Sequence, residues 1–164
     1  KFNRLYGQTF KIPEPYILED VKTIIGTDGR KMSKSYKNVI PLFGEKSDLA
    51  AQVMSIVTDS KGEKEPKDPA SCNIFAMHRL VSSESELKEL EKRYQEGSIS
   101  YKESKEILIE RLEKVLSPMR EKYKNFINNE AELKKILKEG GEKAGEKAAK
   151  KMSEVRQKVG LEIY

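Results

Sequence analysis

At residues 100–116 the sequence reads SYKESKEILIERLEKVL. Ser100 and Glu103 have the spacing of a capping box, in which each side chain satisfies a backbone N–H at the start of a helix. The apolar residues that follow recur every three or four positions, so they fall on one helical face: Ile107, Leu108, Leu112, Val115 and Leu116. The stretch therefore predicts a long helix with one buried stripe, which Pro118 should kink or interrupt.

Three shorter helices are predicted before this stretch. The first covers residues 47–57 and is capped by its opening serine. The second begins at Asp68, with Pro69 at its first position, where a missing N–H costs nothing. The third opens at Ser83 or at the next residue and stops at Gly97, a typical C-terminal cap.

A last helical region follows the long one. Asn129 and Glu132 favour its start, Gly140-Gly141 should break or weaken it, and Gly160 should end it. Five or six helices with short connections predict a helical bundle, so the fold class is mainly α.

Residues 1–43 differ from this pattern. They contain Pro13, Pro15 and Pro41, and their apolar runs at 16–18 and 21–25 are too short for helices and favour strand or extended segments. Nothing in them closes a sheet. We expect residues 1–45 to be the truncated C-terminal end of a Rossmann-type α/β domain and residues 46–164 to be a separate helical domain with a basic C-terminal helix.

Composition excludes several classes of protein. The 164 residues contain no apolar run of the length that a membrane span needs, and a single cysteine, Cys72, excludes an internal disulfide and is compatible with the cytoplasm. The formal net charge of +5 lies between residues 134 and 158. This basic stretch predicts either a nucleic-acid contact or a solvated Lys/Glu helix face. The only histidine, His78, is interpreted as a structural or a surface residue and not as a catalytic one.

Two lysines and two serines gather in Lys31-Met32-Ser33-Lys34-Ser35, which Arg30 separates from a Gly-Thr-Asp-Gly turn. On a tight loop, Lys31 and Lys34 project from nearly the same side and can embrace a triphosphate, with the serine hydroxyls as further donors. Cations placed on the departing pyrophosphate would stabilise the transition state of attack at the α-phosphorus. The alternative is an exposed basic turn without a ligand.

The same five residues resemble the KMSKS motif of class I aminoacyl-tRNA synthetases. The flanking residues 26–30 and 36–43, the approach at residues 2–15 and the helical stretches at 68–75 and 97–105 resemble the tryptophanyl branch of that family. The resemblance covers residues 1 to about 158. It is weaker to the tyrosyl branch.

The resemblance implies activation of tryptophan by ATP, with Mg2+, and transfer to the cognate tRNA, without a permanent cofactor. It implies that Lys31 and Lys34 are catalytic and that the ATP site also includes Ile25, Gly26, Met32, Ser33 and Ser35. It places tRNA contacts in the helical region, for which the candidates are Arg79, Lys105, Lys147, Lys150 and Lys151. It further implies a homodimer for the full-length enzyme, while the state of the fragment stays open.

The second nucleotide motif of the family, of the HIGH type, is not found, because His78 has the wrong surroundings for it. We therefore expect this chain alone to be inactive, since a Rossmann crevice needs several βαβ units. The competing hypothesis is a helical RNA-binding or interaction module that is not an enzyme.

Overall fold

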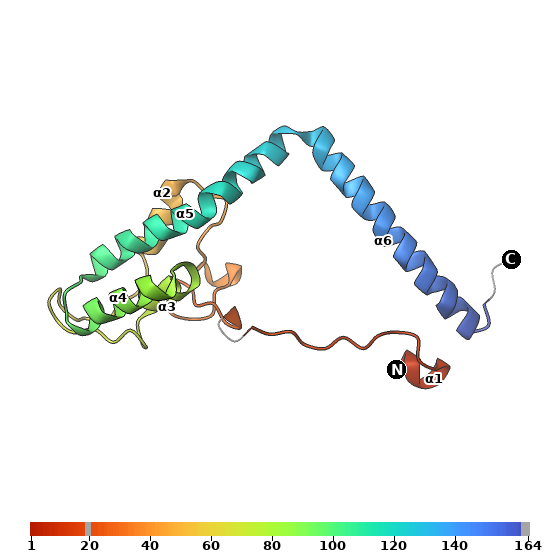
Figure 1. Ribbon diagram of the computed structural model, residues 1–164, viewed down its shortest axis with the longest axis horizontal. Coiled ribbons are helices and arrows are strands. Elements are labelled where there is room, and N and C mark those ends of the chain that lie inside the picture. Colours follow the sequence, from red (N-terminus) through yellow and green to blue (C-terminus); the bar gives the residue numbers. More distant parts are fainter. Residues whose placement is uncertain (19–20, 162–164) are drawn as a thin grey trace. The chain divides into compact units, whose positions relative to one another are not determined.

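The computed structural model describes residues 1–18 and 21–161 (Figure 1). These residues form two compact units, one of residues 17–123 and one of residues 1–16 together with 124–164. The prediction of a mainly helical chain is confirmed. Within the described ranges the runs expected as strand or extended segments form no strand, and a single antiparallel bridge joins Ile25 to Lys31. A short extended segment needs a neighbouring strand to become a stable ladder, and residues 11–18 have none.

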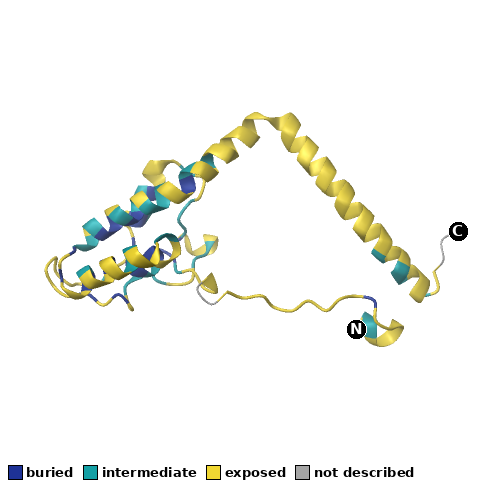
Figure 2. Cartoon of the chain, viewed as in Figure 1, coloured by how far each residue is buried: buried dark blue, intermediate teal, exposed yellow. Residues whose placement is uncertain are grey.

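The unit of residues 17–123 is built from α2 (Lys46–Met54), α3 (Asn73–Val81), α4 (Glu84–Gln95) and most of α5 (Tyr101–Asn128). Its buried residues gather where these helices meet (Figure 2). One cluster contains Leu49, Val53, Ile56, Ile74, Met77, Leu108 and Leu116, and a second contains Phe75, Leu90, Tyr94 and Ile99. Of the stripe predicted for the long helix, Leu108 and Leu116 are buried and Ile107 and Leu112 pack against these clusters partly buried, whereas Val115 is exposed, contrary to the prediction.

Two predicted helix starts are wrong. Helix α2 is capped by Glu45, which forms a capping box with Asp48, two residues earlier than the predicted Ser47 cap. Helix α3 begins after Cys72, because the carboxylate of Asp68 accepts the backbone N–H of Ala70 at 2.9 Å and the Ser71 hydroxyl at 2.7 Å. Those local bonds make a turn that competes with a helix.

The connection from α4 to α5 follows the prediction closely. Ser83 and Glu86 form the capping box of α4, and the Ser100 hydroxyl accepts the backbone N–H of Glu103 at 3.0 Å at the start of α5. Gly97 lies between them with φ +68, and a Cβ at this position would stand 2.5 Å from the carbonyl oxygen of Lys64. Only glycine fits both the left-handed backbone and this close approach.

Pro118 does not end α5. The ring removes one backbone hydrogen bond from a helix of 28 residues. Leu116 is buried just before it, and Tyr123 stacks on Phe43 with ring centroids 4.7 Å apart just after it. Packing on both sides offsets the lost bond, so the expected interruption is not seen.

The second unit contains α1 (Phe2–Tyr6) and α6 (Glu130–Lys158). Asn129 caps α6 as predicted, by accepting the N–H of Glu132. The helix is not broken at Gly140-Gly141, where a break or a weakening was expected. Ion pairs one turn apart lie before these glycines or span them: Lys134–Glu130, Lys135–Glu139 and Lys138–Glu142. Among the described residues no helix combines the length and the apolar composition that crossing a membrane requires.

Candidate functional site

The candidate site is a loop of residues 24–38, called here the signature loop. Its first half is a tight hairpin in which the N–H of Gly26 donates to the carbonyl of Arg30 at 2.6 Å, and the N–H of Met32 donates to that of Ile24 at 2.8 Å. At the turn, Gly29 has φ +79 and the Asp28 carboxylate accepts the N–H of Arg30 at 3.0 Å. The Thr-Asp-Gly sequence thus builds the reversal that brings the lysines to the surface.

The base of the signature loop is anchored to the helical core. Ile25 and Met32, together with Ile40, pack against the first core cluster. The N–H of Val57, after α2, donates to the carbonyl of Thr27 at 2.8 Å. The amide of Asn73, at the start of α3, donates in turn to the carbonyl of Val57 at 3.0 Å. The helices therefore hold the loop at its base while its tip faces water.

The polar side chains of the KMSKS string stand at the exposed tip. A single turn of 3-10 helix, η2 (Lys34–Tyr36), carries the second lysine, and Lys31 precedes it by three residues. Both lysines are exposed, and among the described residues neither takes part in an ion pair. The hydroxyl groups of Ser33 and Ser35 lie 2.8 Å apart. Two free ammonium groups beside a hydroxyl pair are suited to bind a flexible polyanion.

The neighbouring Arg30 forms its contacts with other residues of the loop. The guanidinium of Arg30 lies 2.6 Å from the Asp28 carboxylate and 4.6 Å above the ring centroid of Tyr36. The hydrogen bond from Asn38, followed by those from Arg30, lowers the pKa of Asp28 to about 2. A charged Asp28 neutralises Arg30, so the positive charge offered to a ligand comes from the lysines.

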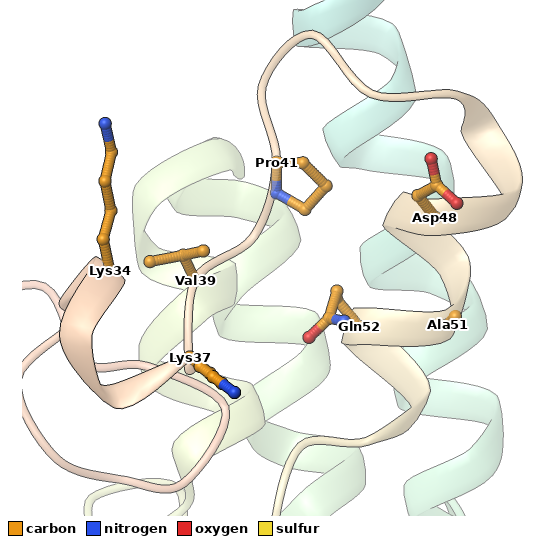
Figure 3. Close-up of a pocket in the computed structure, with 7 residues that line it drawn as sticks. All are labelled: Lys34, Lys37, Val39, Pro41, Asp48, Ala51 and Gln52. Carbon is orange, nitrogen blue, oxygen red and sulfur yellow. The ribbon is translucent and has the colours of Figure 1, made fainter.

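An open groove of about 440 Å3 separates the second half of the signature loop from α2 (Figure 3). The side chains of Lys34 and Lys37 lie on its loop side and point in different directions. Asp48, Ala51 and Gln52 of α2 form the opposite wall.

Sequence reasoning did not identify Asn38, the last residue of the signature loop, which is almost completely buried. Its side-chain amide contacts the backbone on both sides of Met32 and the carboxylate of Asp28. No periodicity or charge pattern marks a single asparagine in a polar loop. Only its position three residues after the last serine of the string could have drawn attention to it.

The candidates for tRNA contact occupy different environments. Arg79 is exposed on α3, with its guanidinium 5.4 Å from the ring centroid of Phe75. Lys105 is buried, and its ammonium donates to the carbonyls of Met54 and Ile56 at 2.8 and 2.7 Å. The carbonyls lie at the end of α2, where a cation is favoured.

The remaining candidates lie on α6. Lys147 and Lys150 are exposed, as is Lys143 one turn earlier, and spacings of four and three residues put all three on one face. No ion pair joins this face to another described residue. Lys151, in contrast, donates to the carbonyl of Thr9 at 2.8 Å and pairs with Glu154 at 2.5 Å.

His78 is structural, one of the two roles that the sequence left open. It is fully buried, and its Nε2 lies 3.1 Å from the Ser104 carbonyl of α5. Its Nδ1 lies 3.2 Å from a guanidinium nitrogen of Arg111 and therefore accepts a hydrogen bond. Burial, followed by the charge of Arg111, lowers the pKa of His78 to about 4. The ring is thus a neutral link between α3 and α5.

Comparisons with known proteins agree with these features. Residues 1–117 match the family described as tRNA synthetases class I (W and Y). Tryptophan–tRNA ligase of Campylobacter jejuni is 41% identical over 161 residues, which are 98% of this chain and 50% of that protein. Tryptophan–tRNA ligase of Bordetella pertussis is also 41% identical, over 99% of this chain and 36% of its own length.

Among solved structures, the tryptophanyl-tRNA synthetase of Campylobacter jejuni complexed with ADP and tryptophan matches with a TM-score of 0.83 and 41% identity. That match covers 97% of this chain and 50% of the solved chain. The chain spans about half the length, or less, of the relatives it matches. The resemblance to the tryptophanyl branch is confirmed, and the chain belongs to the class I tRNA synthetases of the tryptophan and tyrosine family.

Proposed function

We propose that this chain supplies the ATP-phosphate loop and the tRNA-facing helices of a tryptophan–tRNA ligase. The observation that carries the proposal is the signature loop, whose base is fixed to the helical core while Lys31 and Lys34 stand free at its tip. The relatives named as tryptophan–tRNA ligases support the choice of amino acid. The substrates would be ATP with its Mg2+, tryptophan and tRNA.

In the first step, a tryptophan carboxylate oxygen attacks the α-phosphorus of ATP and pyrophosphate leaves with its electron pair. Negative charge grows on the leaving group as its bond to the α-phosphorus lengthens. Ammonium groups on a loop that can close over that group bind it more tightly in the transition state than in the ground state. We assign this role to Lys34 first and to Lys31 second, with the Ser33 and Ser35 hydroxyls as supporting donors.

The chain by itself is proposed to be inactive. An α/β crevice for ATP and amino acid requires several parallel strands with crossover helices, and the described residues contain one isolated bridge. The relatives have about as much chain again or more. We propose that this chain works as part of a protein of that length.

The decisive assay is amino-acid-dependent exchange of pyrophosphate into ATP by the full-length protein that carries this chain. Tryptophan should support exchange, and tyrosine at the same concentration should give at least about 100-fold less, because a pocket built to hydrogen-bond one side chain rejects another. The 164 residues alone should show no exchange above a Lys34→Ala control. Exchange that depends on tyrosine instead would move the protein to the other branch, and exchange with neither amino acid would favour a binding module.

For tRNA, we propose the exposed α6 face of Lys143, Lys147 and Lys150 as a phosphate contact. These side chains are exposed, lie four and three residues apart on one helical face, and are free of ion pairs with described residues. Arg79 is kept as a further candidate in the other unit. Lys105 and Lys151 donate to backbone carbonyls, so their contribution to tRNA binding should be small.

A further inference from the structure

The signature loop has few regular backbone hydrogen bonds to keep its shape. Its regular secondary structure consists of the bridge between Ile25 and Lys31 and the single turn of η2. Between them lie Met32 and Ser33, which connect the two lysines. Backbone groups in such a segment need other partners if they are to adopt one conformation.

Asn38 provides those partners from inside the loop. Its Oδ1 accepts the N–H of Ser33 at 2.8 Å, and its Nδ2 donates to the carbonyl of Lys31 at 3.2 Å. The same Nδ2 donates to the Asp28 carboxylate at 2.7 Å, and the Asn38 carbonyl accepts the N–H of Thr27 at 3.0 Å. One side chain thus joins the turn of the hairpin to both ends of the Lys31–Ser33 segment.

The chemistry of the partners permits only one orientation of this amide. A carboxylate and a carbonyl accept hydrogen bonds and cannot donate them, whereas the N–H of Ser33 can only donate. Rotation of the amide by 180° would place its oxygen against the two acceptors and its NH2 group against the donor. Aspartate, which has no donor when ionised, would place a second negative charge beside Asp28.

Neighbouring residues hold Asn38 in place. A Cβ on Gly26 would lie 2.3 Å from Cγ of Asn38, so the glycine allows the loop to close onto the amide. Lys37 has φ 55, a left-handed conformation that ends η2 and turns the chain inward. The side chain of Asn38 is 2% exposed, and so it has no contact with a ligand in solution.

We propose that Asn38 is a positioning residue for the phosphate-binding lysines, acting through the backbone of Lys31–Ser33. It orders this segment before ATP binds, so that the ammonium groups of Lys31 and Lys34 reach the pyrophosphate without a further loss of backbone freedom. This inference rests on the proposed function of the loop. It adds a residue that touches no substrate.

The test compares steady-state kinetics of tryptophan-dependent pyrophosphate exchange in the full-length protein. Asn38→Ala should lower kcat by about 10- to 100-fold, the size expected when a catalytic group is misplaced by about 1 Å. The KM for tryptophan should stay within about twofold, because the role proposed for the loop is in binding the phosphates of ATP. Asn125→Ala, on an exposed position of α5, is the control and should match the wild type.

A second set of variants separates positioning from folding. Asn38→Asp should be at least as impaired as Asn38→Ala, and adding Asp28→Asn should recover several-fold of the lost kcat, because it restores a donor–acceptor pair between the two positions. If Asn38→Ala does not fold, the comparison of Asn38→Asp with the double variant decides alone. The proposal is overturned if folded Asn38→Ala keeps kcat within about twofold, or if the double variant recovers nothing. Absence of exchange in the wild type would refute the proposed function, and this inference with it.

Discussion

Lys105 lies inside the helical unit, where its ammonium group contacts two carbonyl oxygens at the end of α2. Its stem crosses from α5, so one side chain connects two helices. Burial lowers the pKa of this group, which shows that the surroundings disfavour its charge. The two carbonyls offset that penalty by accepting hydrogen bonds from it.

Replacement of Lys105 by methionine keeps the apolar stem and removes the donor. We expect the free energy of unfolding to fall by about 1–3 kcal/mol, because the carbonyls of Met54 and Ile56 lose their partner in a buried place. Urea denaturation of the chain measures this change. The control is Lys102→Met on the same helix, where the side chain is 76% exposed and the effect should stay below about 0.5 kcal/mol. Equal effects at the two positions would contradict the structural role of Lys105.

At the scale of elements, His78 connects α3 to α5 in its neutral form. The pKa of His78 is about 4 in the folded chain against 6.5 for a free side chain. Between these values the unfolded chain takes up a proton that the folded chain refuses, so stability falls as the pH decreases. The contribution is present above pH 6.5 and is lost on going down towards pH 4.

This linkage predicts a loss of about 2 kcal/mol in the free energy of unfolding between pH 7 and pH 5. Urea denaturation at several pH values measures it. In a His78→Gln variant, which has no titrating group at this position, stability should be lower at pH 7 but should change much less between the two pH values. The same slope in both proteins would show that His78 does not titrate as stated.

The helix boundaries could be predicted from the sequence where a local capping residue had no competing hydrogen bond. Ser83, Ser100 and Asn129 mark helix boundaries because their side chains accept hydrogen bonds from nearby backbone N–H groups, and Gly97 marks one because it adopts a positive φ. The prediction failed at Asp68, whose side chain bonds equally well within a turn.

Tertiary and charge interactions explain the other differences. Pro118 stays inside α5 because residues on both sides of it are packed, and propensity alone could not show that packing. In the candidate site, the lysines and serines could be found as a string of residue types. Asn38 could not, because its importance comes from three contacts formed only when the loop folds.

At the scale of the whole molecule, the basic face of α6 makes a prediction about tRNA. Binding of Lys143, Lys147 and Lys150 to phosphates would release counterions. Each such contact steepens the slope of log affinity against log salt concentration by about 0.7–0.9. Replacing all three by glutamine should therefore reduce the slope by about 2. The matched control replaces Lys134, Lys135 and Lys138, which carry the same charge on the same helix but form ion pairs. An equal change of slope in the two triple variants would mean that α6 contributes only general charge.

The signature loop is the feature on which the proposed activity depends, and the charge of Lys34 can be tested against a neighbour. Lys37 lies three residues further on and lines the same groove, but its side chain points elsewhere (Figure 3). Glycine is the suitable replacement there, because position 37 has a positive φ. Lys34→Ala and Lys37→Gly thus remove the same charge from two places in one loop.

The most direct measurement is kcat for tryptophan-dependent pyrophosphate exchange in the full-length protein with each of these two substitutions. Lys34→Ala should lower kcat by about 100-fold, the loss typical of removing one group that stabilises transition-state charge, while Lys37→Gly should stay within about threefold of the wild type. If Lys34→Ala exchanges pyrophosphate as fast as Lys37→Gly, the loop does not act on the phosphates of ATP.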